Sequence, residues 1–325
     1  MALNRVSSDT AKVNRSSGLI LTGVLAACIG LGACSTTSSA SMKGGDLDTL
    51  YSFRDLKLTA SSGREVPVRM FRPAADCSPC DLIIFSHGAF ATYDRYDVLL
   101  ANWAALGYVV VAPQHIDSEE HPERTLYADV DPLPTRMEDY VVVSDHFGVD
   151  DVTADGLSFS GQQFATGHSL GGLIALLQGG AALGKDDADY MRTEEPPVAV
   201  VAVSPPGEIP ELISAGGYSS VSEPLLVVTG TTDILPGFID EWQTHLDSYD
   251  ANQTDNAYAL IFEGMNHYFN GAFGRITPEG KDARPAVETL NTQIDAFLHA
   301  AGSDEAPSGP DWDQRDNSIV RILQK

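Results

Sequence analysis

A serine flanked by glycines gives the first indication of chemistry in this chain, in the run Gly167-His168-Ser169-Leu170-Gly171-Gly172. The run contains the pattern G-x-S-x-G. Residues 164–166 before it can form a short buried strand, and the small and apolar residues 170–183 after it predict a helix. A serine on a tight turn between strand and helix exposes its hydroxyl above the sheet, where it can act as a nucleophile. The pentapeptide alone is also compatible with an ordinary glycine-rich turn before a helix.

A nucleophilic serine needs a base to take its proton and an acid to orient that base. Among the eight histidines, His267 comes directly after the last expected strand. Asp233 follows the apolar run 225–229, so it stands at the end of a strand between the serine and the histidine. The alternatives are a surface role for the histidine, a helix-capping role for the aspartate, and Glu263 as the acid.

An ester or amide carbonyl under attack also needs two hydrogen-bond donors for its developing oxyanion. The Leu170 amide is one candidate, because it lies at the N-terminus of the expected helix. The second is expected in Ser86-His87-Gly88-Ala89-Phe90, directly after the apolar run 82–85. We assign this role to the Ala89 amide, with the Phe90 amide as the alternative, and expect His87 to be structural.

The elements that must position these groups alternate between strands and helices. The expected strands are residues 50–59, 65–71, 82–85, 108–112, 164–166, 198–203, 225–229 and 257–262. The expected helices are residues 93–106, 136–147, 170–183, 238–246 and 286–300. This alternation predicts an α/β fold with a mostly parallel central sheet and helices on both faces. Residues 204–225, the usual place for a lid, are too few for a large cap domain.

With these motifs in their order, the chain resembles the alpha/beta-hydrolase superfamily over roughly residues 50–300. The resemblance rests on His87-Gly88, the run 167–171, Asp233 and His267. It implies the alpha/beta-hydrolase fold, with Ser169, Asp233 and His267 as catalytic residues and the Ala89 and Leu170 amides as the oxyanion hole.

Two stretches resemble a narrower branch, the bacterial platelet-activating-factor-acetylhydrolase-like or dienelactone-hydrolase-like proteins. They are Phe85-Ser86-His87-Gly88-Ala89-Phe90 and Gly107-Tyr108-Val109-Val110-Val111-Ala112-Pro113-Gln114-His115. True dienelactone hydrolases use a cysteine nucleophile, whereas this chain has a serine at that position. The resemblance therefore implies the branch without its specific activity.

Residues 1–33 are typical of a secretory leader, with a basic start and an apolar stretch too short for a comfortable membrane span. The leader ends in Leu31-Gly32-Ala33-Cys34, which resembles a bacterial lipobox with Cys34 as the lipidated residue. Cys28 is a second and weaker match, and an ordinary cleaved signal peptide is the alternative. We expect an exported lipoprotein of the bacterial cell envelope, held on the outer membrane through Cys34 and facing the periplasm or the surface. Residues 34–48 are then a flexible tether, residues 49–302 the catalytic domain, and residues 303–325 a charged tail.

The chain of 325 residues has a formal net charge of −25, and the leader contributes +2, so the mature protein is near −27. Such acidity argues against nucleic acid and anionic bilayers as partners. In the exported protein Cys77 and Cys80 remain, in a loop before a strand. We interpret them as a small disulfide, with free thiols or a metal half-site as the alternatives; a zinc site is not expected without a second cysteine pair.

The function expected from these observations is hydrolysis of short-chain or soluble carboxylic esters, with no metal or organic cofactor. Phe90, Tyr93 and Tyr268 are candidates for an apolar substrate pocket, and each is also a plausible core or rim residue. A thioesterase, peptidase or acyltransferase would use the same residues, and a non-catalytic binding lipoprotein is the alternative of another class. The sequence does not indicate the oligomeric state.

Overall fold

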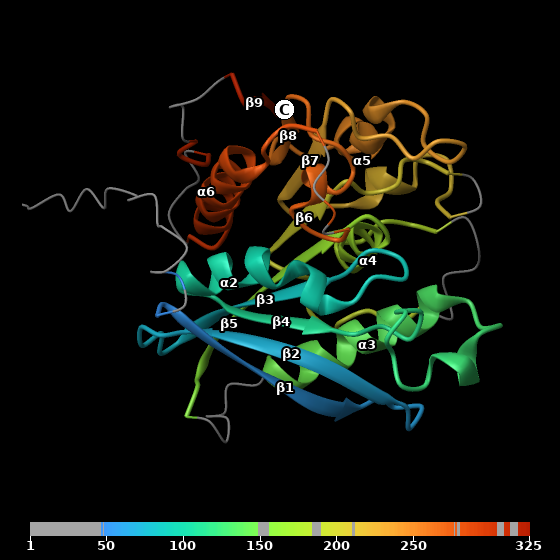
Figure 1. Ribbon diagram of the computed structural model, residues 1–325, viewed down its shortest axis with the longest axis vertical. Helices are drawn as coiled ribbons and strands as arrows, with labels where there is room; N and C mark the ends of the chain where they lie inside the picture. The colour runs from blue at the N-terminus through green and yellow to red at the C-terminus, as the bar shows by residue number, and fades with distance from the viewer. Residues whose placement is uncertain are drawn as a thin grey trace, which may run out of the picture. The chain divides into compact units, whose positions relative to one another are not determined.

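A nine-stranded sheet organises the part of the chain that the computed structural model describes (Figure 1). That part comprises residues 47, 49–148, 156–183, 190–209, 212–275, 277, 280–303, 309–312 and 318–325. All of these residues belong to one unit, Ser41–Lys325. The expected leader, the tether up to residue 46 and the lipidation site Cys34 lie outside the described residues. No helix in the described ranges is long and apolar enough to cross a membrane.

The strands run in the order β1-β2-β4-β3-β5-β6-β7-β8-β9 across the sheet. Their bounds are β1 Tyr51–Thr59, β2 Glu65–Pro73, β3 Cys80–Ser86, β4 Val109–Pro113, β5 Phe159–His168, β6 Ala199–Val203, β7 Leu225–Gly230, β8 Ala257–Phe262 and β9 Val320–Gln324. The six strands from β4 to β8 in this order are parallel, while β1, β2 and β9 pair antiparallel at the two edges. The carboxyl ends of β3, β5, β7 and β8 therefore meet along one edge of the sheet, where ligands bind in open α/β sheets.

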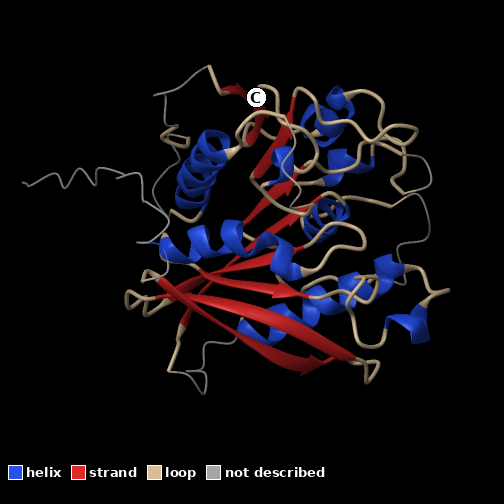
Figure 2. Cartoon of the chain, viewed as in Figure 1, coloured by secondary structure: helices blue, strands red, loops and turns tan. Residues whose placement is uncertain are grey.

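The parallel strands β4, β6, β7 and β8 are almost wholly apolar because helices cover the sheet on both sides (Figure 2). Helices α2 (Asp97–Ala105) and α6 (Arg284–Ala301) share one apolar core with the sheet. Helices α3 (Pro132–Phe147), α4 (Leu170–Gln178) and α5 (Asp247–Ala251) share the other. Alternate side chains of one strand enter the two cores, as Ile83 and Ile84 do in β3. The 3-10 helices are η1 (Tyr93–Tyr96), η2 (Arg124–Tyr127), η4 (Gly217–Ser220), η5 (Trp242–Leu246) and η6 (Phe269–Gly271).

The predicted fold class is confirmed: a mostly parallel sheet has helices on both faces, and the described residues include no large cap. One element prediction is wrong. Residues 238–246 were expected to form one helix, but Gly237 adopts a φ of +80° and Leu235 and Ile239 bond to each other across a tight turn. The helical part consists of η5 followed by α5.

The structure adds two features outside the predicted helices and strands: a strand in the tail and a disulfide before β3. The charged tail after residue 303 was not expected to hold a strand, yet β9 lies in it and pairs with β8. In the loop before β3, Cys77 and Cys80 form a disulfide, as interpreted from their spacing.

Candidate active site

Ser169 stands on a sharp turn between β5 and α4, with backbone angles φ +55° and ψ −120°. These angles are unfavourable for a residue with a side chain, and such strain gathers at functional sites. The turn is possible because its flanking residues are glycines. A Cβ on Gly167 would overlap the carbonyl group of Gly171, and a Cβ on Gly171 would overlap the carbonyl group of Ser86 in β3. The sequence therefore folds into the expected elbow, with the Ser169 hydroxyl at the carboxyl edge of the sheet.

His267 and Asp233 meet Ser169 in one hydrogen-bonded series. The Nε2 atom of His267 lies 3.0 Å from the Ser169 Oγ atom, and its Nδ1 atom lies 2.8 Å from the Asp233 Oδ1 atom. Asp233 follows β7 and His267 follows β8, which are adjacent strands, so both side chains reach the elbow from the same edge. Glu263, the alternative acid, is exposed on the surface instead.

The Asp233 carboxylate is fully buried and held on both oxygens. Its Oδ2 atom accepts hydrogen bonds from the Ser204 hydroxyl at 2.6 Å and the Thr229 hydroxyl at 3.0 Å. Burial opposes the charge of this carboxylate, but its contacts with His245 and His267 outweigh burial and hold the pKa of Asp233 well below its ordinary value. Asp233 is therefore ionised at neutral pH and fixes the proton of His267 on Nδ1.

The structure distinguishes between the two candidates for the second oxyanion donor. The Phe90 amide donates a hydrogen bond to Asp117 Oδ2 at 3.1 Å, so it is already engaged. The Ala89 and Leu170 amides have no hydrogen-bond partner among the described residues, and both residues line the cavity above Ser169. The geometry thus favours Ala89 and Leu170 over Phe90.

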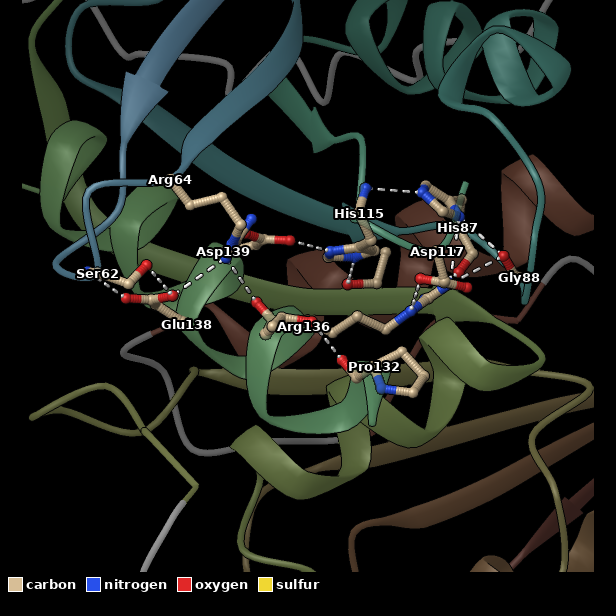
Figure 3. Close-up of polar contacts among 12 residues, drawn as sticks. Ser62, Arg64, His87, Gly88, His115, Asp117, Pro132, Arg136, Glu138 and Asp139 are labelled. Atoms are coloured by element: carbon tan, nitrogen blue, oxygen red, sulfur yellow. Dashed lines mark hydrogen bonds and ion pairs between the residues drawn. The ribbon is translucent and has the colours of Figure 1, made fainter. Parts of the chain in front are cut away.

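Arg136 holds the loop that carries Ala89, and its side chain is fully buried under that loop (Figure 3). It donates to the carbonyl oxygens of His87 and Gly88 at 2.7 and 3.1 Å. It also binds both oxygens of Asp117, each at 2.8 Å. Burial opposes the charge of Asp117, but attraction to Arg136 keeps the pKa of this carboxyl well below its ordinary value. We call Arg136 and Asp117 the loop clamp; together they fix the peptide groups on both sides of the Ala89 amide.

A second layer of buried polar groups surrounds the clamp (Figure 3). The His115 amide donates to His87 Nε2 at 3.0 Å, and the His115 ring lies between Asp139 and the Ser86 hydroxyl at 2.8 and 3.1 Å. Arg64 from the start of β2 reaches Asp139 at 2.5 Å. Burial lowers the pKa of both His87 and His115 well below the ordinary value, so both rings are neutral. The expectation that His87 is structural agrees with these contacts.

His168, next to the nucleophile, connects three loops of the site. Its Nε2 atom lies 2.8 Å from the His267 carbonyl oxygen, and its Nδ1 atom lies 2.9 Å from the Tyr96 hydroxyl. That hydroxyl accepts a hydrogen bond from the Gly88 amide at 3.1 Å. Burial lowers the pKa of His168 to about 3, so the ring is neutral and donates from Nε2 while it accepts on Nδ1. The elbow, the oxyanion loop and the His267 loop therefore share one set of hydrogen bonds.

His245 also contacts Asp233, which the sequence reasoning missed because it placed this residue in the middle of a helix. Its Nε2 atom lies 2.9 Å from Asp233 Oδ1, and its Nδ1 atom lies 2.6 Å from the Pro205 carbonyl oxygen. Asp233, His245 and His267 bring ligand atoms within 4.8 Å of one another and could hold a metal ion by type and distance. An ion there would have to displace the proton that His267 shares with Asp233, so it would compete with the hydrogen-bonded arrangement.

A cavity of about 380 Å³ opens directly over Ser169 and is lined mainly by apolar side chains. Phe90 and Tyr268 line it, as expected. Tyr93 does not, because its ring packs against the Arg69 guanidinium at 4.5 Å. Tyr96, three residues later, lines the cavity instead. The remaining lining residues are Gly88, Ala89, Ala91, His168, Ser169, Leu170, Pro206, Leu212, Leu235, Phe238, Ile239 and His267.

Comparisons with known proteins bear on the fold. No family model matches the chain, and neither does any curated protein sequence. Solved structures do match. An esterase from Pseudomonas putida aligns with a TM-score of 0.56 at 16% identity, over 80% of this chain and 86% of its own. An esterase from Pyrococcus furiosus aligns with a TM-score of 0.53 at 15% identity, over 80% and 95%.

A third structure, from Klebsiella pneumoniae and named as a dienelactone hydrolase, aligns with a TM-score of 0.51 at 17% identity, over 74% of this chain and 96% of its own. These likenesses confirm the alpha/beta-hydrolase fold expected from the sequence, and one of them bears the name of the narrower branch that the sequence resembles.

Proposed function

We propose that this protein is a serine hydrolase that cleaves carboxylic esters through an acyl-enzyme on Ser169. The observation that carries the proposal is the hydrogen-bonded series from Asp233 through His267 to Ser169, set beside the unpartnered Ala89 and Leu170 amides. The esterases among the structural neighbours support the same class of reaction.

In the acylation step, the Ser169 oxygen forms a bond to the ester carbonyl carbon while His267 Nε2 takes the hydroxyl proton. The carbonyl π electrons move onto oxygen, and Asp233 stabilises the resulting imidazolium without taking the proton itself. The tetrahedral intermediate then collapses. The bond to the alcohol oxygen breaks, His267 gives its proton to that oxygen, and the acyl group stays on Ser169.

Deacylation repeats the sequence with water as the nucleophile. His267 takes a proton from the water, the hydroxide oxygen attacks the acyl carbon, and collapse returns the proton to Ser169 while the carboxylic acid leaves. In both steps the negative charge appears on the same oxygen. The Ala89 and Leu170 amides donate to it, and the elbow and the loop clamp hold these donors in place before substrate arrives. Such preorganisation accounts for a large part of catalysis in acyl transfer.

The cavity supports an uncharged ester of modest size as the substrate. The described residues that line it include no lysine, arginine, aspartate or glutamate, so a charged acyl group would lose hydration without gaining a partner among them. A volume of about 380 Å³ is at the small end for ligand sites. Phe90 and Phe238, each more than half exposed, leave the mouth open and apolar. These features favour the short-chain or water-soluble esters expected from the absence of a large lid.

The test is hydrolysis of p-nitrophenyl esters from acetate to palmitate by the leaderless protein and by Ser169→Ala. We expect the highest rates with short chains and the loss of all turnover in the variant. Ser222→Ala, at an exposed serine far along the chain from the site, is the matched control and should keep full activity. Turnover that survives in Ser169→Ala would contradict the proposal. If the protein cleaves no ester but does cleave a thioester or a peptide, the same residues would be assigned to that reaction instead.

We also propose that Cys34 carries a lipid that holds the protein on the outer membrane, with no nucleic-acid partner. The support is the lipobox-like run before Cys34 and the acidity of the chain. Growth of an expressing bacterium with an alkyne-labelled fatty acid should label the wild-type chain and the Cys28→Ala variant, but not Cys34→Ala. Equal labelling of both variants would overturn the assignment.

A further inference from the structure

We propose that His245 is a buried imidazolium that positions the Asp233 carboxylate. Its positive charge also weakens the attraction of Asp233 for a proton on His267. This inference rests on the proposed function, since it assigns a role within the same site. His245 touches no position that substrate would occupy, so it is a positioning residue and not a catalytic one.

The protonation of His245 follows from its two neighbours. Its Nδ1 atom faces a backbone carbonyl oxygen at 2.6 Å, and its Nε2 atom faces a carboxylate oxygen at 2.9 Å. A carbonyl and an ionised carboxylate can only accept hydrogen bonds, and a neutral imidazole carries only one N–H group. A neutral His245 would therefore place a nitrogen without a proton next to one of these oxygens. A proton on each nitrogen removes that repulsion.

The surroundings of His245 make the cation stable in spite of its burial. The residue is completely shielded from solvent, and burial by itself would lower its pKa. The contact with Asp233 and the Pro205 carbonyl outweigh burial and raise the pKa of His245 above its ordinary value. The Nε2 atom lies close enough to the carboxylate for an ion pair, although the contact lacks the alignment of a good hydrogen bond.

Four titratable groups face His245 from the elements packed around it. Asp233 comes from the turn after β7, and His267, whose ring is stacked on His245 with centroids 5.6 Å apart, comes from the loop after β8. His168 at the end of β5 is neutral. Asp247 at the start of α5 is half-buried and accepts the Glu208 amide at 2.8 Å. Asp233 is thus the one carboxylate in direct contact with the cation among the described residues.

The shared carboxylate oxygen gives His245 an effect on the reaction. Asp233 Oδ1 contacts both imidazoles, so its negative charge is already balanced when His267 is neutral. A proton that arrives on His267 then adds net positive charge beside His245, which repels it. His267 therefore gives its proton more readily to the leaving alcohol. At this separation the effect on the acid side of the activity profile is about one to two pH units.

The first experiment compares the pH profiles of kcat/KM for the wild type and His245→Gln. Glutamine can donate to Asp233 but carries no charge. We expect the acid-side midpoint to rise by at least one pH unit, with most of the activity recovered at high pH. A purely structural role for His245 would lower activity at every pH without moving the midpoint, and that result would overturn the proposal. His299→Gln, at a histidine with a side chain 75% exposed, is the matched control and should leave the profile unchanged.

The second experiment measures the protonation of His245 directly in the wild-type protein, so its result depends neither on activity nor on how well a variant folds. Long-range nitrogen–proton NMR of the ¹⁵N-histidine-labelled wild-type protein separates neutral rings, with two different nitrogen shifts, from imidazolium rings, with two similar ones. At pH 7.5 we expect one buried ring of the imidazolium type, absent from the spectrum of His245→Gln. A neutral His245 at that pH would refute the inference even if Ser169 proves to be the nucleophile. Turnover that survives in Ser169→Ala would instead refute the proposed function.

Discussion

Two carboxylates support this site, Asp233 fully buried and Asp117 nearly so, and they are paired in opposite ways. Asp233 contacts two imidazoles, His267 and His245, which can gain or lose protons. Asp117 is paired with the guanidinium of Arg136, which stays charged at every working pH. Asp233 contacts His267, the proposed base. Asp117 and Arg136 hold the loop that carries the Ala89 amide.

The difference matches what each part of the proposed reaction requires. The base gains and loses a proton twice per turnover, so its partners have to respond to protonation. The oxyanion donors must stay in one place while charge appears and disappears in front of them, which a permanent ion pair achieves better than a titrating one. Substitutions on the two sides should therefore differ in kind: those around Asp233 change how activity depends on pH, and those around Asp117 change the maximal rate at all pH values.

The largest effect is expected from Asp233→Asn. The amide can donate to His267 and so stabilises the wrong tautomer, which should lower kcat about 10⁴-fold while the fold remains. Steady-state kinetics with a p-nitrophenyl ester measures the loss, and circular dichroism confirms the fold. A loss below about tenfold would mean that another acid orients the base.

Arg136→Gln should reduce kcat by about 10²- to 10³-fold with little change in KM, because the Ala89 amide is no longer held toward the oxyanion. Affinity for a boronic acid that mimics the tetrahedral intermediate should fall in parallel. Arg136→Lys, which keeps the charge but not the fork of donors, should recover only part of the rate.

The unpaired Asp117 would also destabilise Arg136→Gln, by about 3–5 kcal/mol. The double variant Arg136→Met with Asp117→Asn removes the unpaired charge and should recover most of the stability but not the rate. If rate and stability recover together, the clamp acts on folding alone.

Stability should fall in mild acid because of the neutral histidines around the clamp and the elbow. Burial lowers the pKa of His87, His115 and His168 below the ordinary 6.5, so the unfolded chain binds more protons than the folded one as the pH drops below 6.5. Asp139, whose pKa burial raises to about 6, opposes part of this effect by taking up a proton in the folded state.

The net loss is on the order of 2 kcal/mol between pH 6.5 and 5.5. His245 adds nothing in this window, because a raised pKa leaves it protonated in both states below 6.5. Urea unfolding at the two pH values measures the change. An unfolding free energy that stays constant would show that these histidines are charged in the folded protein.

The smallest effect is expected from Phe90→Ala, which tests the role of the Phe90 side chain apart from that of its backbone amide. Phe90→Ala keeps the backbone contact with Asp117 but removes an apolar wall of the cavity, so KM for aromatic or butyryl esters should rise about tenfold with kcat nearly unchanged. Tyr93→Ala, at a ring that packs on Arg69 outside the cavity, should leave both constants within twofold. Equal effects of the two substitutions would mean that the cavity is not the acyl site.

The sequence allowed prediction of the groups that have local signatures. Ser169 is marked by its glycines, and Asp233 and His267 by their places after apolar strands. Arg136 and His245 have no such marks, because each acts through contacts that exist only once distant segments are packed. The error at Tyr93 has no local signature that could have prevented it: this ring packs on Arg69, while Tyr96 at the other end of the same 3-10 helix lines the cavity.

The error over residues 238–246 has a different origin. Apolar residues there follow a helical spacing, but Pro236 and Gly237 impose a turn that the spacing does not report. The turn, in fact, brings Phe238 and Ile239 to the cavity, so a local exception to the pattern contributes to the site.

The last strand has a practical consequence for storage and handling. β9 pairs with β8, whose residues Ala257–Phe262 are wholly apolar or aromatic and completely buried. Lys325 secures the pairing through its amide on Ala257 and its ammonium group on the Asp250 and Asn252 carbonyls. A carboxypeptidase that trims residues 320–325 would uncover an apolar strand edge while Ser169, Asp233 and His267 stay in place. Slow clouding of an active sample would then be the first sign of damage, well before any drop in its specific activity.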